Sequence, residues 1–169
     1  TIDYVTIATT GNATDFGDRT VAGSRAGRGE NDTRAVSMGG GSGINTIDYI
    51  TMATTGNATD FGDRQTSDYN GGGTGGAGRA IAIGGHLAQT VMEYVTIATT
   101  GNGTDFGDLS VGARGCDACS NDTRGVRAGG VTEQVTLDYW NMITAANAVD
   151  FGDLNDGKQY TGSFSGVSL

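Results

Sequence analysis

Hydrophobic and polar residues alternate at the start of this chain. The segment 1–7 is rich in Val, Ile, Thr and Tyr, which is typical of a β-strand. Gly11–Asn12 follows and predicts a turn, after which the chain returns through the segment 14–18. We therefore expect Tyr4 and Phe16 to lie on neighbouring antiparallel strands.

The same phrase occurs four times, once every 45 residues. A fixed period of this size indicates a repeat architecture. A residue that is present in every copy is more plausibly architectural than catalytic, because an active site needs one asymmetric constellation. We therefore expect structural roles for the repeated aromatic residues, which are Tyr4, Tyr49, Tyr94, Tyr139, Phe16, Phe61, Phe106 and Phe151.

Polar, glycine-rich stretches that differ between copies separate the phrases. They are residues 19–32, 64–78, 109–123 and 154–163. A short apolar strand that ends in Gly-Gly follows each of the first three stretches, at residues 34–40, 79–85 and 124–130. No segment shows the apolar period of a helix. Each unit therefore offers three strands, and we expect a fourth strand in the variable stretch.

Four short antiparallel strands in a unit of this length are typical of a propeller blade. A linear β-solenoid is the alternative, but hexapeptide and nonapeptide solenoids have much shorter periods. The predicted fold is all-β, a four-bladed β-propeller that forms a single domain over residues 1–169. Its repeats are residues 1–45, 46–90, 91–135 and 136–169.

The order of these features resembles the kelch repeat: an apolar strand, Gly-Gly, a loop, the tyrosine strand, a turn and an aromatic strand. Gly-Gly follows Met38, Ile83 and Ala128, as the double glycine does in kelch units, and phenylalanine stands where kelch usually has tryptophan. The interval between the tyrosine and this phenylalanine is longer than in kelch. The repeated phrase also resembles tandem repeats in uncharacterised proteins of marine bacteriophages and marine metagenomes, several of them tail-fibre-like.

The first copy starts at the tyrosine strand, in the middle of a kelch blade. The last residues, 166–169, are expected to form the strand that precedes it. Pairing of this C-terminal strand with the N-terminal hairpin would close the ring and protect its edges. If the ring stays open, the free edge is expected to pair with a neighbouring molecule.

Charge and composition exclude some partners. The net charge is −9, from 10 Lys and Arg against 19 Asp and Glu. A nucleic-acid ligand is not expected, because binding it needs a basic face. Insertion into a membrane is not expected either, since no apolar run reaches about 20 residues.

Cys116 and Cys119 form a CxxC pair without the four ligands of structural zinc. They are interpreted as part of an ordinary loop, and their redox state is left open.

Repeated carboxylates are the main candidates for chemistry. The sets Asp15, Asp60, Asp105, Asp150 and Asp18, Asp63, Asp108, Asp153 would each form a ring in a closed propeller. A ring that faced the channel would suit calcium, because this ion prefers carboxylate oxygens. The favoured interpretation is structural: no metal and no cofactor, with these aspartates accepting hydrogen bonds from nearby backbone amides.

The asparagines of the Asn-x-Thr sequons, such as Asn12, are interpreted as turn residues.

Three arginines also recur in register, at Arg34, Arg79 and Arg124. We expect each to form a structural ion pair with an aspartate of the repeat. A ligand-facing arginine on a loop face is the alternative.

The function expected from these features is a non-enzymatic structural or adhesion module. The resemblance suggests a phage virion component, either a tail fibre or a surface decoration, located in the virion or outside the cell. The variable stretches would form the contact surface, with other virion proteins or host surface glycans as partners and a homo-oligomer as a further option. The alternatives are a carbohydrate-binding lectin with repeated sites and, less favoured, a hydrolase that uses paired aspartates. The ligand-binding residues are unknown, and no catalytic residue is identified.

Overall fold

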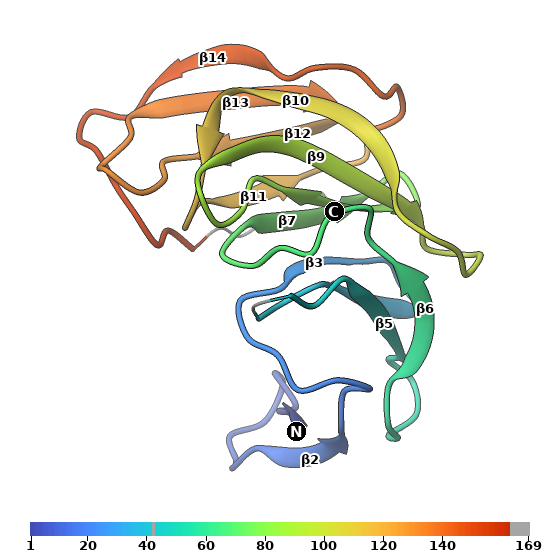
Figure 1. Cartoon of the computed structure of the whole chain (residues 1–169). Helices are drawn as coiled ribbons and strands as arrows, with labels where there is room; N and C mark the ends of the chain where they lie inside the picture. The colour runs from blue at the N-terminus through green and yellow to red at the C-terminus, as the bar shows by residue number, and fades with distance from the viewer. Residues whose placement is uncertain (42, 163–169) are drawn as a thin grey trace.

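A computed structural model describes residues 1–41 and 43–162. Those residues form only β-strands, turns and loops, so the all-β prediction is confirmed. The strands make four antiparallel sheets (Figure 1). Sheet A contains β1 (Ile2–Tyr4) and β2 (Thr14–Gly17); sheet B contains β3 (Gly27–Glu30), β4 (Arg34–Met38), β5 (Thr46–Thr51) and β6 (Thr59–Asp63). Sheet C contains β7 (Gly72–Gly76), β8 (Arg79–Ile83), β9 (Gln89–Thr96) and β10 (Thr104–Ala113); sheet D contains β11 (Asp117–Ser120), β12 (Arg124–Ala128), β13 (Thr136–Asn141) and β14 (Val149–Asp153).

The strand expected in the variable stretch is present in the first three copies, as β3, β7 and β11. It pairs with the Gly-Gly strand, which in turn pairs with the tyrosine strand of the next copy. Each four-stranded sheet therefore begins in one repeat and ends in the following one. Within the described residues, sheet A has the last two of these strands.

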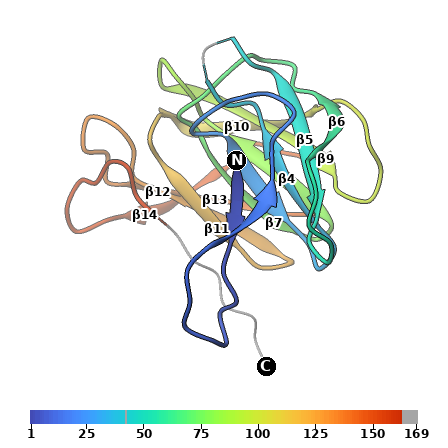
Figure 2. The same ribbon diagram turned by 90° about the horizontal axis from the view of Figure 1, so that it is seen from below.

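The sheets stack on one another in chain order, with sheet A at the bottom and β14 at the top of Figure 1. Figure 2 looks onto the sheet A end, with β1 in front. One apolar core lies between sheets B and C and includes Val36, Ile47 and Phe61. The second lies between sheets C and D and includes Ile81 and Trp140. The closed four-bladed ring is not confirmed, and its expected closing strand at 166–169 lies outside the described residues.

The central strand β8 buries both of its sides, with small residues on one side and large ones on the other. On β8, Ala80 and Ala82 belong to the core shared with sheet B, whereas Ile81 and Ile83 belong to the core shared with sheet D. On β12, Gly125 leaves the space that the Trp140 indole fills, 2.3 Å from where a Cβ would be. Alternation of small and large residues therefore sets the spacing between sheets.

The repeated tyrosine and phenylalanine lie on adjacent strands and form an edge-to-face pair in every copy. Their ring centroids are 5.9 Å apart for Tyr4–Phe16, 5.8 Å for Tyr49–Phe61, 5.7 Å for Tyr94–Phe106 and 5.8 Å for Tyr139–Phe151. A β-bulge occurs at each of these positions; in sheet B, Ile47 faces Gly62 while Asp48 faces Asp60, which leaves Phe61 as the extra residue. The bulge increases the local twist of the strand.

The three repeated arginines stack on the tyrosines rather than pairing with aspartates. Arg34 lies 4.4 Å from the Tyr49 ring centroid, and equivalent contacts join Arg79 to Tyr94 at 4.4 Å and Arg124 to Tyr139 at 4.7 Å. The guanidinium of Arg34 also donates to the Ile97 carbonyl oxygen in sheet C at 2.9 Å. In place of the expected ion pair, each guanidinium makes a cation–π contact with the tyrosine ring of the adjacent strand.

Backbone hydrogen bonds join each unit to the next along a seam. The seam has two parts: a docking strand (residues 16–18, 61–63, 106–108 and 151–153) and a docking loop (residues 11–13, 56–58, 101–103 and 146–148). Between sheets A and B, Gly56 N donates to Phe16 O at 2.7 Å and Ala58 N donates to Asp18 O at 2.8 Å. Asn57 Oδ1 accepts from Asp18 N at 3.0 Å.

The same bonds recur along the stack. Gly101 and Gly103 donate to Phe61 and Asp63, and Ala148 donates to Asp108. Asn102 and Asn147 accept from the amides of Asp63 and Asp108. The repeated asparagine therefore links units, in addition to its expected place in a turn.

Glycine in the docking strand is required by this contact. A Cβ on Gly17 would lie 2.4 Å from Gly56 O, and a Cβ on Gly62 would lie 2.5 Å from Gly101 O. Gly17 and Gly62 also have φ values of +149° and +148°, which disfavour any residue with a Cβ. The invariant glycine of the phrase thus allows the next unit to approach.

Buried ion pairs cross the same interfaces. The acid that precedes the repeated tyrosine is buried in sheets B, C and D as Asp48, Glu93 and Asp138. Arg19 of the preceding unit pairs with Asp48 at 3.1 Å, and Arg64 pairs with Glu93 at 2.8 Å.

The third interface uses a different arginine. Leu109 stands where the first two copies have Arg19 and Arg64, and Asp138 pairs instead with Arg127 of its own sheet at 2.5 Å. Both side chains are fully buried. Since an unpaired buried carboxylate is costly, the loss of one arginine is balanced by the gain of another.

We predict that Gly62→Ala destabilises the fold by about 2–4 kcal/mol, through the clash with Gly101 added to the strain of positive φ. Gly152→Ala is the matched control, because its φ is +136° but no atom lies within 4 Å of the added Cβ. Its cost is expected to be the strain alone, about 1–2 kcal/mol. Urea unfolding measures both; equal losses of stability would contradict a role of Gly62 in the seam.

We also predict that Arg127→Ser costs about 3–5 kcal/mol, because Asp138 is left buried without a cation. Leu109→Arg introduced into that variant restores the arrangement of the first two interfaces and is expected to recover most of the loss. A double-mutant cycle by urea unfolding measures the coupling. Additive effects of the two substitutions would disprove the compensation.

Candidate functional site: a groove lined by the variable stretches

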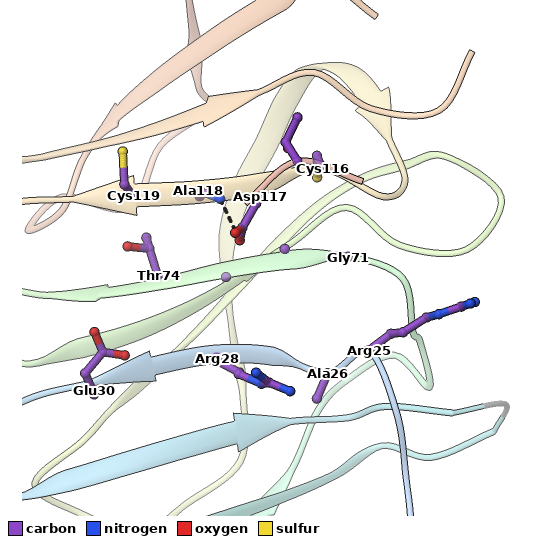
Figure 3. A pocket seen from close by; sticks show the side chains of 13 residues that line it. Arg25, Ala26, Arg28, Glu30, Gly71, Thr74, Cys116, Asp117, Ala118 and Cys119 are labelled. Carbon is purple, nitrogen blue, oxygen red and sulfur yellow. Dashed lines mark hydrogen bonds between the residues drawn. The ribbon is translucent and has the colours of Figure 1, made fainter. Parts of the chain in front are cut away.

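A groove with a volume of about 510 Å³ lies over β3, β7 and β11. Figure 3 shows it from close by, with side chains from all three strands along its walls. Its lining comes from segments 25–30, 71–74 and 116–119 together with Thr161. Each of these belongs to a different variable stretch, so all four predicted contact stretches meet in one groove.

Glycines bring the three strands close enough to form one surface. A Cβ on Gly73 would lie 2.4 Å from Arg28 N, and one on Gly75 would lie 2.3 Å from Glu30 N. On the other side of β7, a Cβ on Gly72 would lie 2.9 Å from Cys116 O. The backbones therefore pack directly on one another, and side chains larger than hydrogen would push the strands apart.

Strand β3 has glycine on its buried side and charged residues on its exposed side. Gly27 and Gly29 are buried, whereas Arg28 and Glu30 are exposed and line the groove. Figure 3 shows Glu30 at one end of the groove and Arg25 and Arg28 toward the other. The groove thus carries side chains of both charges, with Asp117 on the β11 wall as a second carboxylate.

Hydroxyl groups join the neighbouring strands β7 and β11. The hydroxyl oxygens of Thr74 and Ser120 are 2.7 Å apart, and Ser120 also donates to Gly75 O at 2.5 Å. Asp117 accepts a bond from the Ala118 amide at 2.9 Å. The hydroxyl bonds hold β7 and β11 together beside the groove, and a site of this kind is usually largely formed before a ligand binds.

Both cysteines line the groove as free thiols. Cys119 lies on the extended strand β11 and Cys116 directly precedes it. Three steps along an extended chain span roughly 10 Å, more than a disulfide bridges. Burial raises the pKa of the Cys116 thiol to about 11.

The candidate carboxylate rings of the sequence analysis follow the edge of the stack. The side chains of both sets are exposed; their members are Asp15, Asp60, Asp105, Asp150, Asp18, Asp63, Asp108 and Asp153. Over residues 1–41 and 43–162, no group of three or more His, Cys, Asp or Glu side chains is placed to hold a metal ion.

The residues singled out in the sequence build the scaffold rather than the groove. None of the repeated tyrosines, phenylalanines or arginines is among the lining residues. Sequence reasoning located the stretches that form the groove but not Arg28 or Glu30 within them. The alternation of glycine and charge in Gly27–Glu30 is the signal that could have identified both.

A second hollow, of about 380 Å³, lies at the far end of sheet D. It contains Arg124 and Tyr139 together with Asn121, Thr123 and Asn141. The amide oxygens of Asn121 and Asn141 are engaged in local turns. This hollow combines an aromatic ring with amide and hydroxyl groups.

Comparison with protein-family models and with the curated proteins gives no match for this chain. No helix in the described part is long and apolar enough to cross a membrane.

We predict that iodoacetamide at pH 8 modifies Cys119 far faster than Cys116. With its pKa raised to about 11, only about 0.1 % of the Cys116 thiol is ionised at that pH, and the thiolate is the reactive form. Peptide mass spectrometry of the folded protein measures the two rates, and the same reaction in urea is the control, in which both cysteines should react. Equal rates in the folded protein would contradict this arrangement.

Proposed function

We propose that this chain is a non-enzymatic recognition module in which a rigid stacked scaffold presents the variable stretches to a ligand. The observation that carries the proposal is the groove over β3, β7 and β11, which is lined by all four of these stretches. Loops on a rigid scaffold tolerate sequence change and carry recognition. The constant phrase meanwhile supplies the seams and the cores.

The chemistry of the groove suits a polar, extended ligand. Arg25 and Arg28 offer planar donors, Glu30 offers an acceptor, and Thr74 adds a hydroxyl group. No aromatic side chain is among its lining residues, so binding would depend on hydrogen bonds and charge.

The resemblance to kelch units and to repeats of marine phage proteins supports a more specific proposal: a virion component such as a tail fibre or surface decoration, in the virion or outside the cell. Its partners would be other virion proteins or glycans of the host surface. The groove does not depend on ring closure, and the closed four-bladed propeller stays a prediction.

The alternative is a lectin, which the second hollow favours. A tyrosine ring beside amide and hydroxyl groups can stack on the apolar face of a sugar while the polar groups bond its hydroxyls. Arg34 with Tyr49 and Arg79 with Tyr94 repeat the stacked pair in sheets B and C. Several weak sites per chain are expected in that case.

Two measurements test these proposals. Mass spectrometry of purified phage particles is expected to detect the chain, and an array of defined glycans tests sugar binding. If bacterial cells or glycans are bound, Arg28→Glu should weaken binding at least about tenfold without changing the melting temperature, because Arg28 is exposed. Lys158→Glu is the matched control, since this exposed cation lies outside the groove.

The Arg28→Glu result separates the two functions. If binding survives Arg28→Glu but is lost in Tyr139→Ala, the ligand binds at the second hollow and not in the groove, which favours the lectin. Turnover of a glycan by the purified chain would overturn the non-enzymatic proposal.

A further inference from the structure

The stack has one uncovered face at each end. No described segment packs on the docking loop of sheet A or on the docking strand of sheet D. The head face belongs to sheet A and consists of Val5, Ile7 and the docking loop 11–13. The tail face belongs to sheet D and consists of Val126, Leu137 and the docking strand 151–153. In Figure 1 these faces lie at the bottom and the top of the molecule.

The burial of equivalent residues shows what the head face lacks. Ile97 and Met142, which correspond to Ile7 in the third and fourth copies, are 0 % exposed in the two cores. Met52, covered only by the two-stranded sheet A, is 40 % exposed, and Ile7 is 98 % exposed. Exposure thus follows the size of the preceding sheet, so the Ile7 position is built to pack against one.

The tail face shows the converse. Phe16, Phe61 and Phe106 are 8 %, 2 % and 1 % exposed beneath the following unit, whereas Phe151 is 51 % exposed. Gly152 has no atom within 4 Å of an added Cβ, although its equivalents in the first three copies each receive a docking loop there. The fourth copy therefore has a complete docking strand, but no described docking loop packs on it.

We propose that a second copy of this chain covers these faces, with the docking loop 11–13 of one molecule on the docking strand 151–153 of another. The contact repeats a seam that the chain already forms between sheets A and B, B and C, and C and D. Asn12 corresponds to Asn57, Asn102 and Asn147, so its Oδ1 would accept from the Asp153 amide. Because the two faces differ, the contact is head to tail and can repeat from molecule to molecule.

One component of the inner seams is absent from this contact. Leu154 stands where the first two copies have arginine, so Asp3 of the next molecule would meet no guanidinium from the tail face. Each chain also carries a net charge of −9, and like-charged molecules repel less as salt increases. Association is therefore expected to be weaker than the internal seams and to strengthen with salt.

Sedimentation velocity of the 169-residue chain at increasing protein and salt concentration tests the proposal, and species larger than a monomer are expected. Ile7→Asp should raise the dissociation constant at least about tenfold, while circular dichroism and melting temperature stay unchanged because Ile7 is exposed. Asn12→Ala should raise it roughly fivefold. Asn57→Ala is the matched control: the same change inside the stack should lower stability and leave association unchanged.

A gain of function makes the test independent of loss-of-function variants. Leu154→Arg should lower the dissociation constant roughly tenfold by pairing with Asp3 of the next molecule, and Asp3→Ala in the same chain should abolish the gain. A chain that stays monomeric at all concentrations, including as Leu154→Arg, overturns the proposal. So does association that neither Ile7→Asp nor Asn12→Ala weakens, or a monomer that Ile7→Asp destabilises, since the head and tail would then meet within one chain.

Discussion

The contact between the docking loop of one unit and the docking strand of the preceding unit is the constraint on which the stack depends. It needs a residue without a Cβ, because the carbonyl of the incoming loop lies where that Cβ would be at Gly17 and Gly62. Once the backbones meet, the asparagine and the flanking amides complete the hydrogen bonds. The sheets are then close enough for their apolar faces to form the two cores.

Stacking buries a carboxylate at every interface, and the chain meets that cost in two ways. The first two interfaces use an arginine from the preceding unit, and the third uses Arg127 from the same sheet. Additional donors are supplied by Thr20, Thr66 and Ser110. The requirement is thus for a paired charge at that place, and the position of the arginine in the sequence is free to change.

The structure separates the residues that build it from those that can vary. The aromatic pairs, the stacked arginines and the docking glycines lie on the other three strands of each sheet and at the seams. The variable stretches supply β3, β7 and β11, where glycine allows close packing and side chains such as Arg28 and Glu30 line the groove. A change at Arg28 or Glu30 would alter the groove without touching a core, which is how one scaffold can serve different ligands. The two end faces that no described segment covers are a consequence of the same repetition.

The sequence by itself determined the strands, because their alternation and turn residues are local signals, and it determined the 45-residue period. It also located the stretches that meet in the groove. The tertiary structure decided the rest. Arg34 stacks on Tyr49 rather than pairing with an aspartate because the choice of partner depends on which strand lies beside it. Arg127 can make up for the missing arginine at position 109 only because β10 and β12 both lie beside Asp138. Whether the units form a ring or a row depends on the rotation at each seam, and no single repeat encodes that angle in its own residues.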